Sequence, residues 1–164
     1  YHVGQEPLYY NIKNTGRPVS KGDVFWSHYT DAPNEALYPF GYGLSYTTFE
    51  FTNLSVSDSQ MKVGETLTVS VDVTNTGDVA GDEVPQLYIH QKWGTDTRPM
   101  RELKGFQRIS LEPGETKTVE FGLGPKELTY WSANVHDWIQ DAAEYDVWVG
   151  TDSTATLHTE FEVI

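Results

Sequence analysis

Carboxylates are the most abundant side chains in this sequence that could carry out catalysis. The chain has 24 Asp and Glu residues, and two carboxyl groups about 5–10 Å apart can act as nucleophile and general acid in the hydrolysis of a glycosidic bond. The acids that can be placed lie on the polar side of alternating segments or in turns: Asp72, Glu120, Glu160, Glu162, Asp78, Asp82 and Glu115. Such positions face water. We therefore predict no catalytic residue within this chain.

Sequence motifs for nucleotide, metal or thiol chemistry are missing. Residues 41–46 (GYGLSY) begin like a dinucleotide-binding fingerprint, but they lack its third glycine and a preceding strand. The five His residues are scattered without the spacing of metal ligands, and there is no Cys. We predict neither a cofactor nor a metal site.

Aromatic side chains are the remaining candidates for a binding site. They form 13% of the chain, and an exposed Trp or Tyr can stack on the apolar face of a sugar ring without using a charge. The residues that we single out as possible sugar or interdomain contacts are Trp26, Tyr42, Trp93, Trp131 and Trp138. A simpler interpretation, which we favour, is that the Trp rings cover the ends of the fold or pack on a neighbouring domain.

The elements that would position these side chains are mostly β-strands. Between residues 67 and 74 apolar and polar residues alternate strictly, which is the pattern of a half-buried strand. Similar signals occur in five other segments: 49–56, 87–89, 119–123, 145–149 and 157–163. The alternation changes phase within 49–56, which predicts a bulge near Asn53. About seven short strands separated by turns predict an all-β, antiparallel sandwich over residues 47–164.

Proline and glycine mark the connections between these strands. Pro113 and Gly114 suit the two central positions of a type II turn. Pro85 fits the start of a strand, where a missing N–H group is tolerated. Residues 125–128 (PKEL) could form a single helical turn.

Residues 1–46 have a different texture from the rest of the chain. They show no sustained period and are dense in Gly, Pro, Asn and Tyr, which indicates turns and extended segments. An irregular stretch of this length is unusual inside a compact domain, and its many aromatic side chains need a surface to pack against. We predict an irregular N-terminal arm that lies on another domain.

Charge narrows the possible partners. The formal net charge is −13, so the chain repels nucleic acids and anionic lipid headgroups, whereas a neutral sugar is compatible with it.

No apolar run approaches the roughly 18 residues of a membrane span. The first residues lack the features of a signal peptide and an initiator Met, which suggests a piece of a longer protein. Aromatic residues in the arm make a homodimer a reasonable expectation.

Several segments, in order along nearly the whole chain, resemble the end of the family 3 glycoside hydrolases of the β-glucosidase type. Residues 3–11 (VGQEPLYYN) and 14–18 (NTGRP) resemble the end of that family's α/β sandwich domain, and residues 38–49 (YPFGYGLSYTTF) resemble its hallmark segment before the terminal domain. The segments that resemble the terminal domain are 71–77 (VDVTNTG), 80–84 (AGDEV), 86–89 (QLYI), 102–106 (ELKGF) and 111–115 (LEPGE). Pro85 departs from the family, which often has an aliphatic residue there.

The resemblance implies a fibronectin type III-like, or immunoglobulin-like, β-sandwich preceded by a linker arm. Residues 1–46 would be the tail of the upstream α/β domain with that arm, and residues 47–164 the sandwich. It also implies that the catalytic Asp and Glu lie upstream, in domains of the same polypeptide that cleave β-linked glucosides or β-glucans with retention of configuration. A periplasmic or secreted location follows from the same resemblance.

Two functions from different classes remain open at this point. The first is an accessory, structural domain of a hydrolase, which would be inert when isolated. The second is an autonomous carbohydrate-binding or adhesion module that uses its Trp-bearing loops. We favour the first because the second leaves residues 1–46 without a role.

Overall fold

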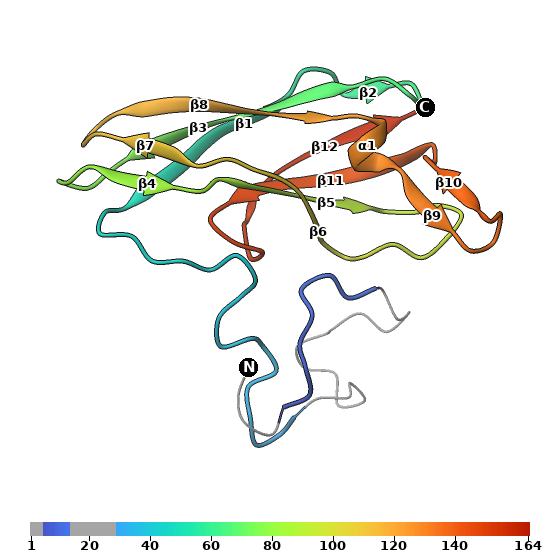
Figure 1. Ribbon diagram of the computed structural model, residues 1–164, viewed down its shortest axis with the longest axis horizontal. Coiled ribbons are helices and arrows are strands. Elements are labelled where there is room, and N and C mark those ends of the chain that lie inside the picture. Colours follow the sequence, from blue (N-terminus) through green and yellow to red (C-terminus); the bar gives the residue numbers. More distant parts are fainter. Residues whose placement is uncertain (1–4, 14–28) are drawn as a thin grey trace.

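The computed structural model describes residues 5–13 and 29–164 and consists almost entirely of β-strands (Figure 1). The elements are β1 (Phe49–Val56), β2 (Gln60–Met61), β3 (Leu67–Asn75), β4 (Gly81–Glu83), β5 (Gln86–Gln91), β6 (Glu102–Phe106), β7 (Ile109–Leu111), β8 (Thr116–Leu123), α1 (Pro125–Leu128), β9 (Tyr130–Ser132), β10 (Asp137–Ile139), β11 (Ala143–Gly150) and β12 (Leu157–Val163). None of the helical segments in the described part has the length or apolar character needed to cross a membrane.

Two sheets pack face to face to form the sandwich. One has the order β1-β3-β8 and the other β2-β12-β11-β5-β6, and they form the upper and lower layers in Figure 1. All neighbours are antiparallel except β2, which pairs with β12 in parallel. Two ribbons, β4–β7 and β9–β10, extend from the sandwich. The predicted all-β sandwich is therefore confirmed.

Strict alternation along the strands creates the core. In β3 every second residue from Leu67 to Asn75 is buried, because successive side chains of a strand point to opposite faces. The facing sheet contributes the inward residues of β11 and β12, including Tyr145 and Phe161, whose rings stack 5.0 Å apart. Burial of apolar surface at about 25 cal/mol per Å² is what holds the two layers together.

The local features expected from the sequence are present. The pairing of β1 with β3 shifts between Thr52 and Ser55, and Asn53 adopts a φ of 55°, so the phase change is a bulge. Gly114 has a φ of 75° in the turn closed by the bond from Glu115 N to Glu112 O, as a type II turn requires. Residues 125–128 form the single helical turn α1.

Asn75 fastens the loop that follows β3. This fully buried side chain accepts hydrogen bonds through Oδ1 from Thr47 Oγ1 (2.7 Å) and Gly77 N (3.0 Å). Its Nδ2 donates to the carbonyls of Val79 (2.8 Å) and Leu111 (3.0 Å). One amide thus ties the start of β1, the loop after β3 and the end of β7 together, with all of its hydrogen-bonding capacity used.

We predict that Asn75→Ala lowers the free energy of unfolding by about 3 kcal/mol, because buried groups of the backbone lose their partners. Urea unfolding followed by circular dichroism measures this change. The control is Asn134→Ala at an exposed position, for which a change below about 0.5 kcal/mol is expected. Equal losses in the two variants would contradict the role given to Asn75.

Candidate functional site

The arm projects from the sandwich below the five-stranded sheet in Figure 1, and a part of it contacts the outer face of that sheet. The ring of Tyr10 stacks on Phe40 with centroids 4.1 Å apart, and it meets Tyr88 of β5 edge-on at 6.0 Å. Tyr88 points away from the core, since its neighbours Leu87 and Ile89 face inward, yet it is 0% exposed. The arm thus covers a large aromatic side chain on the outside of the sandwich.

Gln86, also on β5, fixes the arm by hydrogen bonds. Its Nε2 donates to the carbonyls of Gly41 (3.0 Å) and Thr151, while its Oε1 accepts from the Tyr88 hydroxyl (2.6 Å). Burial raises the pKa of Tyr88 above its ordinary value, so the hydroxyl stays protonated as the donor. Gly41 has a φ of 83°, and a Cβ there would lie 2.1 Å from Gln86 Oε1. Only glycine fits this contact.

Backbone contacts extend the docking of the arm along two loops of the sandwich. Ser153 N donates to Phe40 O (2.9 Å), and Met100 N donates to Ile12 O (2.8 Å). Arg101 supports the first loop by donating from Nη1 to the carbonyls of Ser153 (2.6 Å) and Ala155 (2.9 Å). Both segments of the arm that bracket residues 14–28 are therefore attached to the same face.

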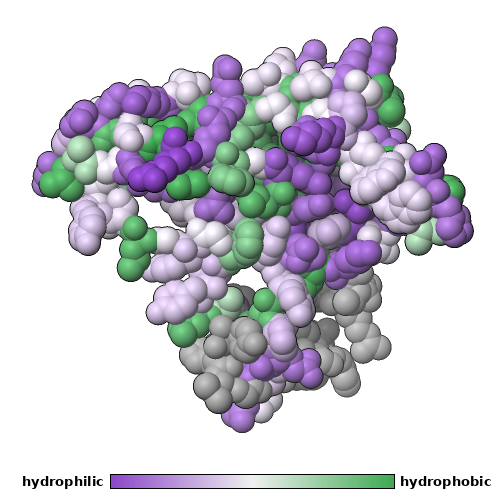
Figure 2. All heavy atoms as spheres, viewed as in Figure 1, coloured by the Kyte–Doolittle hydropathy of each residue, from purple (hydrophilic) through white to green (hydrophobic). Residues whose placement is uncertain are grey.

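The other side of the arm remains exposed and apolar. Its exposed large side chains are Leu8, Tyr9, Ile12, Leu37, Tyr38, Phe40, Tyr42, Leu44 and Tyr46, and several apolar residues are visible on the arm in the space-filling view (Figure 2). A cavity of about 850 Å³ opens between the two arm segments, next to the loop at Ser153. We call this set of side chains the apolar arm surface. Many exposed apolar side chains on one segment indicate a docking site.

Two exposed Trp residues meet on the β9–β10 hairpin. Trp131 and Trp138 are directly opposite each other in the antiparallel pair, with ring centroids 5.9 Å apart at an angle of 73°. Their exposed fractions are 52% and 64%. Cross-strand aromatic pairs stabilise a short ribbon, but the outer ring surfaces of this pair stay in water.

Trp93 lies on a loop that a single carboxylate holds in place. Asp141 Oδ2 accepts hydrogen bonds from Gln91 Nε2 (2.9 Å), Thr95 N (2.9 Å) and the Tyr130 hydroxyl (2.5 Å). Partial burial alone raises the pKa of Asp141, but these hydrogen bonds outweigh it and hold the pKa below its ordinary value. The β5–β6 loop and the base of the β9–β10 hairpin are therefore joined through an ionised Asp141.

Two groups of acidic residues could be compared with a catalytic or a metal site. The first group is Asp82 and Glu83 on β4. Burial raises the pKa of Glu83, whereas hydrogen bonds from Ser110 and Arg108 lower the pKa of Asp82. As neighbours in β4 these two side chains point to opposite faces, so they cannot act across one substrate.

The second group lies on the outer face of β11 and β12. Asp146, His158 and Glu160 have potential ligand atoms within 4.8 Å of one another. However, Lys92 Nζ lies 3.4 Å from Asp146 and 3.1 Å from Glu160. The lysine already supplies the positive charge that these carboxylates need.

Known proteins match both the arm and the sandwich. A family described as fibronectin type III-like domain matches residues 83–153. The periplasmic beta-glucosidase of Salmonella typhimurium is 40% identical over 164 residues, covering 99% of this chain and 21% of that protein. The thermostable beta-glucosidase B of Acetivibrio thermocellus is 38% identical over 154 residues, with coverages of 92% and 20%.

Solved structures give the same result. The beta-glucosidase of Listeria innocua in complex with glucose superposes with a TM-score of 0.88 at 40% identity, over 95% of this chain and 22% of that one. This chain matches the C-terminal, fibronectin type III-like region of β-glucosidases. It spans about a fifth of the length of the curated relatives that it matches.

Within this β-glucosidase region the structure separates the aromatic residues singled out from the sequence. Trp131 and Trp138 come together, and Trp93 lies on a loop at the same end of the sandwich. Tyr42 belongs to the arm, 5.3 Å from the ring of Tyr38. Trp26 lies outside the described residues. Whether any of these residues contacts a sugar or another domain stays a prediction.

Sequence reasoning missed the residues that organise these surfaces. Gln86 and Tyr88 occupy the polar phase of a strand and look like ordinary surface residues, and Asp141 is one acid among many. The sequence did contain one usable signal, the outward-facing Tyr88 two positions after Gln86. A large aromatic side chain on the outer face of a strand predicts that another segment packs over it.

We predict that Gly41→Ala releases the arm from the sandwich, because the new Cβ collides with Gln86 and the positive φ is unfavourable for alanine. Hydrogen exchange of residues 38–46 and limited proteolysis measure the release. The matched control is Gly43→Ala, where a Cβ meets nothing within 4 Å and exchange should be unchanged. Equal protection of the arm in both variants would refute this docking contact.

We also predict a pH-dependent role for Asp141. A carboxyl group whose pKa is lowered by folding stabilises the folded state above its unfolded pKa of about 3.9, and loses this effect as the pH falls through the folded pKa. Asp141→Asn should therefore be less stable than the parent chain at pH 7, with the difference shrinking below about pH 3.9. Urea unfolding at pH 7, 5 and 3 tests this. A difference that is independent of pH would rule out the charge of Asp141 as its cause.

Proposed function

We propose that this chain is the C-terminal accessory domain of a retaining, β-glucosidase-type glycoside hydrolase, whose catalytic Asp and Glu lie in upstream domains. The observation that carries the proposal is the arm, which is bound to the sandwich on one side and offers the apolar arm surface on the other. The relatives support it, since beta-glucosidases match this chain over only about a fifth of their length. Residues 1–46 then form the tail and linker of the upstream α/β domain, and residues 47–164 the sandwich.

The role of the region is mechanical in this proposal. The upstream domain packs on the apolar arm surface, and the sandwich holds the arm in the shape required for that contact through Gln86 and Tyr88. Burial of several aromatic side chains at about 25 cal/mol per Å² would make such a joint rigid. A rigid joint supports the catalytic domains from one side without supplying any reacting group.

The partners and location follow from the relatives. We propose β-linked glucosides or β-glucans as substrates of the whole enzyme, and export to the periplasm or the medium. One relative carries the word periplasmic in its name, and the acidity of the chain argues against partners with phosphate groups. A homodimer, expected from the aromatic residues of the arm, remains a prediction.

The decisive experiment is hydrolysis of a chromogenic aryl β-glucoside. We expect no turnover by the 164-residue chain and clear turnover by the full-length enzyme that contains it, because the reacting carboxylates would be upstream. A third sample, the full-length enzyme with Gly41→Ala, should keep its catalytic groups but lose activity at lower temperature than the parent. Reproducible turnover by the 164-residue chain alone would overturn the proposal.

A further inference from the structure

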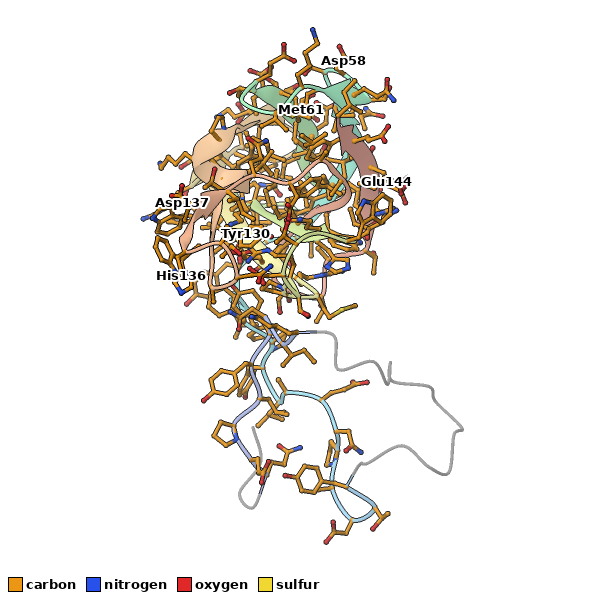
Figure 3. The ribbon with its side chains drawn as sticks, turned by 90° about the vertical axis from the view of Figure 1, so that its right-hand side faces the viewer. Asp58, Met61, Tyr130, His136, Asp137 and Glu144 are labelled. Carbon is orange, nitrogen blue, oxygen red and sulfur yellow. The ribbon has the colours of Figure 1, made fainter. Side chains whose placement is uncertain are left out.

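The β9–β10 hairpin leaves two indole rings in water without a packing reason. Trp131 and Trp138 are more than half exposed, although burying such rings in the core would have stabilised the chain. Val135 in the connecting turn is exposed as well. Figure 3 places His136 and Asp137 at the outer edge of this end of the molecule, with Tyr130 further inside. An exposed apolar cluster on a protruding element indicates contact with a partner.

Contacts within the chain hold the hairpin in its conformation without any bound partner. His136 takes a positive φ of 56° in the turn, and its N–H donates to Ser132 O at 2.9 Å. At the base of the hairpin, the hydroxyl of the buried Tyr130 donates a hydrogen bond to Asp141. The guanidinium of Arg98 lies over the Tyr130 ring, with Cζ 3.9 Å from the ring centroid. The two rings are therefore presented by a braced support, which lowers the entropy lost on binding.

Charge and size decide what kind of partner fits. Residues 129–140 contain no Lys or Arg, and Asp137 is their charged residue at pH 7. The hairpin therefore lacks positive charge, and the whole chain has a net charge of −13. Charge repulsion disfavours both a polyanionic partner and a second copy of this acidic chain. Two rings and a short turn also offer far less than the roughly 1,000 Å² of a stable protein interface.

We propose that Trp131 and Trp138 form a stacking site for pyranose rings of an uncharged β-glucan. The apolar faces of the sugar lie on the indole rings, and the exposed polar groups of Asn134 and Asp137 are available to its hydroxyl groups. The choice of a β-glucan rests on the proposed hydrolase function, whereas the site itself rests on the hairpin. The site would hold the enzyme near a polymeric substrate.

Affinity gel electrophoresis tests this with soluble mixed-linkage β-glucan as the probe. The 164-residue chain should migrate more slowly in gels containing the glucan, and Trp131→Ala and Trp138→Ala should each weaken the apparent affinity about tenfold, the effect of losing one anchor residue. Trp131→Tyr should retain most of the binding, because an aromatic face remains. Phe106→Ala is the matched control, because it removes another exposed aromatic ring, on β6, that is not among the candidate sugar contacts, and no change is expected.

Three results would overturn the proposal: no retardation of the parent chain, equal losses for Phe106→Ala and the hairpin variants, or a shift in the gel without glucan that reports self-association through the hairpin. Amide NMR spectra of each variant, with peaks unchanged away from the hairpin, show that the fold is kept. The aryl glucoside experiment uses neither a polysaccharide nor these variants. Failure of the glucan site and failure of the hydrolase proposal can therefore be told apart.

Discussion

The side chain of Gln86 joins the arm to the sandwich, and most features of the outer face depend on it. It lies on β5, whose inward residues Leu87 and Ile89 belong to the core, so its position is set by the packing of two sheets. Its amide then binds Gly41, Thr151 and Tyr88 at once. Because a buried amide that loses a partner is costly, the core, the arm and the β11–β12 loop are coupled through one residue.

A second junction at the opposite end works by charge rather than by an amide. Asp141 collects donors from β5, from the β5–β6 loop and from β9. The three hydrogen bonds together compensate for the cost of removing this carboxylate from water. An amide thus fastens the arm to the outer face of the sheet, whereas a carboxylate joins the loop of Trp93 to the hairpin of Trp131 and Trp138.

The main strands could be predicted from the sequence because period-2 alternation reports burial directly. β3, β8, β11 and β12 all show it, and the phase change in β1 revealed the bulge at Asn53. Short strands such as β2, β4 and β9 were missed, since two or three residues cannot display a period. β6 was missed because its residues are only half-buried and carry no clear alternation. The role of Asp141 could not be predicted because its hydrogen bonds come from residues far apart in the sequence, whereas for Gln86 the nearby outward-facing Tyr88 was the available signal.

The contact of Tyr10 with the buried Tyr88 bears on where this chain can be cut. A cut at residue 47, where the regular strands are about to begin, would strip the cover from an aromatic ring and leave the amide of Gln86 without its glycine partner. Such a fragment would expose an apolar surface at Tyr88 and would tend to aggregate. A unit chosen for grafting should therefore include the arm with Tyr10 and Gly41, because the sandwich without them would expose Tyr88 and leave an amide hydrogen of Gln86 unpaired.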